Sequence, residues 1–328
     1  MANERIVEIQ NTIVAKVIEA LDNGHPPWVK PWNDFGEGLP YNAATGRKYN
    51  GGNIFWLYIC QMAAGYPRAG WMTFNQAKTL GGMVRKGETG SPVVLYKAET
   101  KPVLDKDGKP VLDDQGKPKF RFVRQERYFT VFNIAQIDGL PERVTNPKHA
   151  LASLTIIERH AAADAFFGAL PGKVVFGGDR AFYTPAGDSI GMPTPEQFAD
   201  TGNYYATLAH EYVHWTGHES RQKRFDKDFR EATGADNAYA YEELIAEMGA
   251  AFLCAELGIA GETQHVTYLA IWVSRLKDQA KMLFQAASAA SKAVAYLQDL
   301  AAGAMGRDDV AADEAEAEDA LVDFAMAA

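Results

Sequence analysis

Residues 203–216 read NYYATLAHEYVHWT and are the most informative segment of the chain. Large side chains recur at helical spacing within it, namely Tyr204, Leu208, Tyr212 and Trp215, which is typical of a buried helix. His210 and His214 are four residues apart and therefore lie on one helical face, where two imidazoles can reach one metal ion. Glu211 lies beside them and can activate a water molecule. The pattern predicts a zinc site.

A zinc hydrolase needs a third protein ligand. Residues 241–247, YEELIAE, offer carboxylates on a second predicted helix. Glu243 and Glu247 are also four residues apart, so one can bind the metal while the other orients an imidazole; we favour Glu243 as ligand and Glu247 as the outer residue. The alternative is that these glutamates bind no metal and only form the solvent-exposed face of a helix. His218 is the competing candidate for the third ligand. It lies one helical turn beyond His214, which favours a contact outside the ligand set. Ser220 replaces the third histidine of the metzincin pattern, which leaves a gluzincin-like site.

Four of the six tryptophans lie within residues 28–71, interleaved with lysines and arginines. Exposed aromatic rings stack on unpaired bases and cations follow the phosphates, so this segment is a candidate for binding single-stranded DNA. The alternative is that the rings belong to a hydrophobic core. The expected contact residues are Trp28, Lys30, Trp32, Asn42, Arg47, Lys48, Tyr49, Asn53, Trp71 and Lys86.

The charge is unevenly distributed along the chain. Residues 1–150 hold 20 Lys+Arg against 15 Asp+Glu, and the remainder holds 13 against 27, although the whole chain carries -9. Phosphate contacts are local and screened beyond about 10 Å, so the excess of positive charge in the first half leaves nucleic-acid binding open.

The chain is predicted to be an α+β protein of two domains. The first domain, 1–145, has a helix at about 3–22, further helices around 54–64 and 74–81, and strands at 92–97 and 120–133. Between these strands, KPVLDKDG, KPVLDDQG and KPKF repeat with a period of eight, which predicts an exposed hairpin. The second domain, 146–302, is mainly helical with a small sheet: a helix at 151–168, strands at 173–176, 181–184 and 189–192, then helices. Residues 303–328 are acidic and are expected to be disordered.

Neither a signal peptide nor a membrane span is predicted, because no stretch reaches the roughly 20 apolar residues that a span requires. Cys60 and Cys254 belong to no CxxC pair and are expected to be reduced core residues. We therefore expect a soluble, cytoplasmic protein.

Several motifs of the first half resemble the N-terminal domain of ArdC antirestriction proteins. They are Trp28-x-Lys30-Pro31-Trp32, Pro40-x-Asn42-x-x-Thr45-Gly46, Tyr49-x-Gly51-x-Asn53, Gly70-Trp71-x-Thr73-x-x-Gln76, Val84-x-Lys86-Gly87-Glu88 and Asn133-x-x-Gln136-Ile137-Asp138-Gly139-Leu140-Pro141. The second half resembles the zincin-type metallopeptidase domain that follows it, through Asp188-x-Ile190-x-Met192-Pro193, residues 210–218 and Glu242-Glu243-x-x-Ala246-Glu247.

The resemblance implies a protein of conjugative plasmids or other mobile elements that binds single-stranded DNA and protects incoming DNA from host restriction. It also implies a Zn²⁺-dependent metallopeptidase, with Mn²⁺ or another divalent ion as a substitute. An unknown protein substrate, such as a host restriction or regulatory protein, would be cleaved. The alternative is a non-catalytic DNA-binding protein whose zinc is structural and which protects DNA by occupying it.

Overall fold

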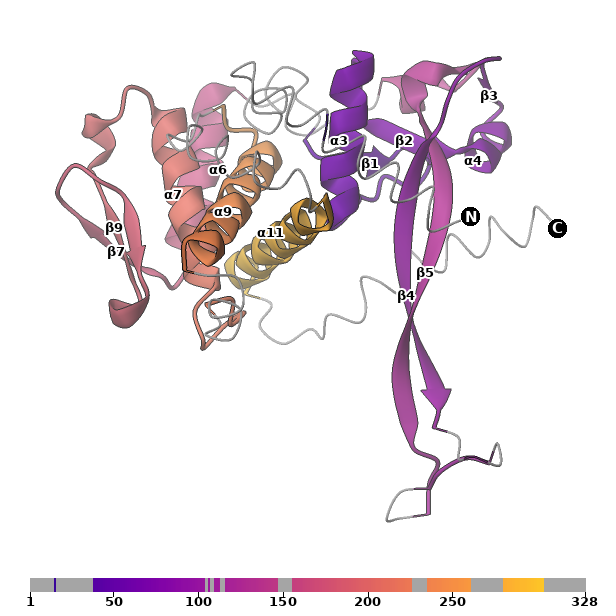
Figure 1. Cartoon of the computed structure of the whole chain (residues 1–328). Helices are drawn as coiled ribbons and strands as arrows, with labels where there is room; N and C mark the ends of the chain where they lie inside the picture. The colour runs from indigo at the N-terminus through magenta and orange to yellow at the C-terminus, as the bar shows by residue number, and fades with distance from the viewer. Residues whose placement is uncertain are drawn as a thin grey trace. The chain divides into compact units, whose positions relative to one another are not determined.

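The computed structural model describes residues 38–103, 106, 109–112, 116–146, 155–225, 235–260 and 280–303, together with Ala15. They form two structural units. The helical unit comprises the described parts of 1–71, 133–135 and 142–305, and the hairpin unit comprises those of 72–132 and 136–141. Both units contain helices and strands (Figure 1). The predicted α+β class is confirmed.

Long helices dominate the helical unit: α3 (Gly52–Ala64), α6 (Ile156–Gly168), α7 (Thr201–Thr216), α9 (Ala235–Leu257) and α11 (Ala280–Ala301), with a short α5 (Glu142–Thr145). At the start of α7, the Asp200 side chain accepts a hydrogen bond of 2.8 Å from the backbone N–H of Asn203. Thr155 and Glu158 form a capping box at α6. Such caps satisfy N–H groups that the first helical turn leaves unpaired. They fix where these helices begin.

Helices α7 and α9 lie side by side (Figure 1). Gly249 of α9 permits this, because a Cβ atom there would lie 2.7 Å from Cγ2 of Val213 on α7. Val213, Leu244 and Phe252 are fully buried. A side chain at position 249 would push the helices apart, so the glycine helps to set the separation of the histidine and glutamate faces.

A small sheet completes the helical unit. It consists of β7 (Lys173–Phe176), β8 (Phe182–Thr184) and β9 (Ser189–Met192), close to the predicted strands. The central strand β9 runs parallel to β7 and antiparallel to β8. Ile190 and Met192 of β9 are fully buried, and β8 and β9 contact α7.

Residues 38–71 belong to the helical unit, whereas the boundary expected from the sequence lies near residue 145. In this segment β1 (Tyr41–Asn42) pairs in parallel with β2 (Gly70–Thr73). Phe55 of α3 meets Phe284 of α11 edge-on, with ring centroids 6.4 Å apart. The Gly51 N–H donates to Oγ of Ser291 (3.1 Å) across 240 residues of sequence. Early and late parts of the chain therefore share one core.

The hairpin unit contains a long antiparallel ribbon (Figure 1). Its strands are β4 (Ser91–Pro102) and β5 (Phe120–Asn133), paired from Ser91 opposite Val131 to Pro102 opposite Phe120. The first strand is longer than the predicted 92–97. The short helix α4 (Phe74–Thr79) precedes β3 (Met83–Val84), which pairs antiparallel with β6 (Ile137–Asp138).

The end of the ribbon is closed by the period-eight repeats. Val103, Val111 and Lys119 occupy the third position of successive repeats. The N–H of Val103 donates to the carbonyl of Lys119 (2.8 Å), that of Val111 to Val103 (2.7 Å), and that of Lys119 to Val111 (2.7 Å). Each repeat gives and accepts one backbone hydrogen bond, so the three repeats form a closed ring.

The predicted first helix, Trp28, Lys30, Trp32 and the acidic tail lie outside the described residues. Within the described part of the chain, no helix is long and apolar enough to cross a membrane.

Candidate metal centre

Helix α7 brings two imidazoles together. The Nε2 atoms of His210 and His214 are 3.1 Å apart, and the ring centroids are separated by 4.7 Å. His210 is 2% exposed. The predicted spacing of four residues thus places both rings on one buried face of the helix.

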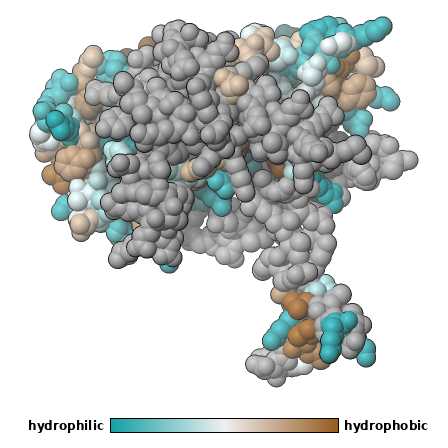
Figure 2. Space-filling model, in the orientation of Figure 1, coloured by the Kyte–Doolittle hydropathy of each residue, from teal (hydrophilic) through white to brown (hydrophobic). Residues whose placement is uncertain are grey.

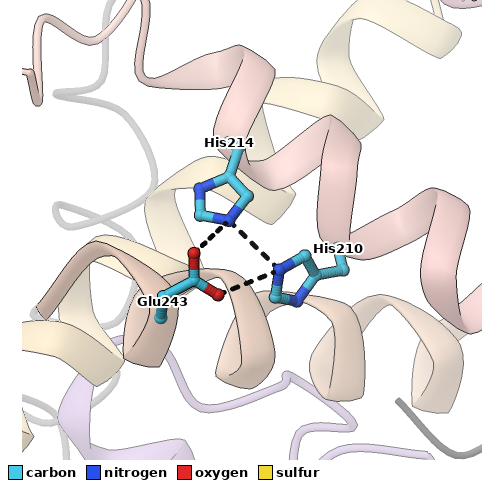
Figure 3. Close-up of side chains that lie close together, drawn as sticks. All are labelled: His210, His214 and Glu243. Carbon is cyan, nitrogen blue, oxygen red and sulfur yellow. Dashed lines mark hydrogen bonds and ion pairs between the residues drawn. The ribbon is translucent and has the colours of Figure 1, made fainter. Parts of the chain in front are cut away.

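Glu243 of α9 faces both rings (Figure 3). One carboxylate oxygen lies 3.5 Å from Nε2 of His210 and the other 3.5 Å from Nε2 of His214. Among the described residues, His210, His214 and Glu243 form a group whose ligand atoms all lie within 4.8 Å of one another. Two imidazole nitrogens and one carboxylate oxygen are a donor set that zinc and other divalent ions accept in catalytic sites. The residues therefore fit a metal ion.

The outward-facing nitrogen of each ring meets a second carboxylate. Oε1 of Glu247 lies 3.4 Å from Nδ1 of His210, and Oε1 of Glu242 lies 3.4 Å from Nδ1 of His214. A carboxylate that accepts the Nδ1 proton fixes the tautomer whose Nε2 lone pair can bind a metal. Glu247 was expected to act from this position, but sequence analysis gave Glu242 no role.

Arg224 holds Glu242 in place. Its guanidinium donates from Nε to Oε2 of Glu242 (3.1 Å) and from a terminal nitrogen to Oε1 (2.8 Å). The same guanidinium donates to Oγ1 of Thr216 (2.7 Å), and the Arg224 side chain is 10% exposed. Sequence analysis did not find Arg224, because it lies in a loop without a recognisable motif.

The charges of the cluster are strongly coupled. Burial opposes the charged imidazole of His214, but hydrogen bonds to Glu242 and Glu243 outweigh it and raise the pKa to about 9. Burial acts to raise the pKa of Glu243, yet hydrogen bonds with His210 and His214 hold it well below its ordinary value. The carboxylates thus favour positive charge between them, which a divalent ion can supply in place of protons.

The other two predicted residues of this region differ in their surroundings. Glu211 is 3% exposed, and its charge helps to raise the pKa of His210. Nδ1 of His218 lies 2.7 Å from Oγ of Ser220, and His218 is not in the cluster of ligand atoms. Glu211 is thus next to the cluster, whereas His218 faces a neighbouring turn.

A second polar network joins the small sheet to the end of α7, and sequence analysis did not predict it. Arg221 forms a two-pronged ion pair with Asp188, which also accepts a hydrogen bond of 2.9 Å from the Tyr183 hydroxyl. The Arg221 guanidinium lies 3.7 Å from the centroid of Trp215. Asp188 adopts a left-handed φ of 42°, which the ion pair helps to hold.

The described members of the predicted DNA-contact set have different surroundings. Trp71 is 0% and Tyr49 9% exposed, so these rings belong to the core and offer no face to a base. Lys48 forms an ion pair with Glu256 of α9. Oδ1 of Asn42 accepts hydrogen bonds from the N–H groups of Ala44 (3.0 Å) and Thr45 (3.1 Å), which stabilises a turn.

The other described members of that set are partly or largely accessible. Asn53 is half-buried, and Arg47 and Lys86 are exposed. Apart from Lys48, which pairs with Glu256, Arg47 and Lys86 are thus the accessible cations of the predicted set among the described residues.

Two family models match the chain. Residues 7–132 match the N-terminal domain of anti-restriction factor ArdC, and residues 161–289 match a zincin-like metallopeptidase. Among solved structures, the metal-free antirestriction ArdC protein from plasmid R388 is 37% identical; the match covers 90% of this chain and 98% of that one, with a TM-score of 0.69. Its Mn(II)-bound structure is also 37% identical, covering 89% and 98%, with a TM-score of 0.67.

Curated relatives are of two kinds. A DNA primase TraC of Escherichia coli is 39% identical over 304 residues, which cover 87% of this chain but 19% of the primase. The chain thus spans only a small part of that relative. The uncharacterized protein y4eC of Sinorhizobium fredii (strain NBRC 101917 / NGR234) is 32% identical, covering 87% of this chain and 90% of that protein.

Proposed function

Because the chain belongs to the ArdC antirestriction family, we propose that it protects DNA entering a cell with a plasmid or mobile element from restriction. It combines a metal-dependent peptidase site with the ability to bind single-stranded DNA. The observation that carries the peptidase assignment is the buried cluster of His210, His214 and Glu243, with Glu211 beside it.

His210, His214 and Glu243 would hold the metal through three donor atoms. When bound, a divalent ion such as Zn²⁺ or Mn²⁺ polarises a carbonyl group and lowers the pKa of a coordinated water. Glu211 would accept a proton from the attacking water and pass it to the leaving amine, acting as general base and then as general acid. Glu242 and Glu247 orient the two imidazoles.

The substrate is an unidentified protein of the host, such as a restriction or regulatory factor. Its cleavage would prevent the restriction of DNA that enters as a single strand. DNA binding would localise the peptidase on that strand.

The test is plasmid transfer into restricting and non-restricting recipients. Glu211→Gln preserves shape but removes the base, so we expect protection to be lost while metal content stays near that of the wild type; removal of a general base typically costs about 10²–10⁴ in rate. Glu219→Gln, an exposed glutamate outside the cluster, is the matched control and should protect normally. If Glu211→Gln holds metal and still protects fully, occupancy of DNA is the better explanation and the peptidase proposal is wrong.

A further inference from the structure

Two elements of the hairpin unit that contact each other, α4 and β3, each carry an exposed large apolar side chain. Phe74, the first residue of α4, is 45% exposed, and Met83 of β3 is 56% exposed. Ala77 of α4 is 1% exposed, so the helix buries one face and leaves Phe74 outside. Figure 2 shows apolar atoms next to hydrophilic ones over α4 and β3. An exposed aromatic ring offers a flat apolar face that a ligand can cover.

Two lysines flank these side chains. Lys78 lies four residues after Phe74 and thus on the same face of α4, and Lys86 follows β3. Both are exposed, and within the described residues neither forms an ion pair. The neighbouring Arg85, in contrast, is paired with Glu88 (2.7 Å) and Asp138 (3.3 Å). The uncompensated charge is therefore that of Lys78 and Lys86.

The stretch of sequence around this surface is positively charged in an acidic protein. Residues 72–132 and 136–141 hold 12 Lys+Arg against 8 Asp+Glu, whereas the whole chain carries -9. This charge complements a polyanion. An aromatic ring between cations can stack on a base only where that base is unpaired, so the complementary polyanion is a single strand.

The surface is also held rigidly. Thr73 and Gln76 form a capping box at the start of α4. The Gly82 N–H donates to the Ala77 carbonyl (2.8 Å), and a Cβ atom at Gly82 would lie 2.6 Å from Cδ2 of Leu140. The turn between α4 and β3 is thus tightly packed, which lowers the entropy lost on binding.

We propose that Phe74, Lys78, Met83 and Lys86 form the surface on which this protein binds single-stranded DNA, with Phe74 stacking on a base and the lysines contacting phosphates. The inference rests on the proposed DNA binding and moves the site away from Tyr49 and Trp71, whose rings are buried.

The test measures binding of the full-length protein to fluorescein-labelled oligothymidylate by anisotropy at several salt concentrations. Phe74→Ala should weaken binding about 5- to 150-fold at every salt concentration, and Phe74→Trp should restore it. Lys78→Ala with Lys86→Ala should reduce the slope of log affinity against log salt by about 1.4, for two phosphate contacts. Ile157→Ala and Lys173→Ala, at exposed positions of the helical unit, are matched controls and should bind like the wild type.

The outcomes separate the two levels of the proposal. If the wild type binds and the folded Phe74→Ala and double-lysine variants bind equally well, the surface is wrong but the proposed DNA binding stands. If the wild type fails to bind at micromolar concentration, both are wrong. If a labelled duplex binds as tightly as the single strand and Phe74→Ala changes neither, stacking on an unpaired base is excluded.

Discussion

The helix pair α7–α9 and the segment 41–71 each contain a cluster of residues that predicts a binding site. Only the cluster on α7–α9 has the predicted arrangement. On α7, two histidines four residues apart converge with Glu243. In 41–71, the aromatic rings of Tyr49 and Trp71 turn into the core. On a helix, a spacing of four residues places two side chains on the same face, because of the helical repeat. Aromatic residues spread over several short elements share no such repeat, so the burial of apolar area decides which way their rings point.

The largest expected effect is the loss of metal on substitution of a ligand, which tests the assignment of the α7–α9 cluster. Glu243→Ala should reduce metal content from about one ion per chain to near zero, because it removes a bond to the ion. Glu247→Ala and Glu242→Gln should weaken metal affinity about 10–100-fold, because they only orient the histidines. His218→Ala should have no effect. Elemental analysis and chelator competition measure all four; a metal site emptied by His218→Ala alone would contradict the assignment.

The second half of the comparison is tested by replacing a buried and an exposed ring. Trp71→Ala should lower the free energy of unfolding by about 3–5 kcal/mol, because it leaves a large cavity. Phe74→Ala, its exposed counterpart, should change it by no more than about 0.5 kcal/mol. Urea denaturation provides both values. If Trp71→Ala instead retains full stability and loses DNA binding, the ring is a stacking platform after all.

The coupled charges of the cluster predict a pH dependence for the protein stripped of metal. The pKa of His214 is raised from an ordinary value near 6.5 to about 9. Protonated His214 therefore adds to the free energy of unfolding. This contribution is fully present below pH 6.5 and is lost as pH rises through 9, by up to about 3 kcal/mol. Urea denaturation of chelator-treated protein at both pH values measures this loss, and His214→Ala should reduce it. Stability that stays constant or increases over this interval would refute the coupling.

The smallest expected effect concerns Lys48. Its side chain is 56% exposed and its partner Glu256 is 8% exposed. Lys48→Ala should therefore cost about 1 kcal/mol of unfolding free energy. It should leave the salt slope of DNA binding unchanged, because Glu256 already neutralises this lysine. A flatter salt slope for Lys48→Ala, measured by anisotropy, would indicate that Lys48 contacts a phosphate of the DNA.

Sequence patterns predicted the parts of the structure that depend on local periodicity. The short strands β7 to β9, helix α7 and the carboxylate face of α9 are such parts. Residues whose role depends on tertiary contacts were not predicted: Arg224 reaches Glu242 from a loop, and Asp188 meets Arg221 across 33 residues. The grouping of residues 38–71 with α9 and α11 was also missed, because no local pattern reports a contact such as that of Gly51 with Ser291.

The closed ring at the end of the β4–β5 ribbon bears on how the length of this part of the protein can vary. A two-stranded ribbon can lose or gain opposed residue pairs and remain a ribbon. In the ring each of Val103, Val111 and Lys119 pairs with two different residues. Deletion of the middle eight-residue repeat would free the Val103 carbonyl and the Lys119 N–H, which can pair with each other across the ribbon. A related chain that lacks the middle repeat could therefore close the same ribbon as an ordinary hairpin with a shorter end.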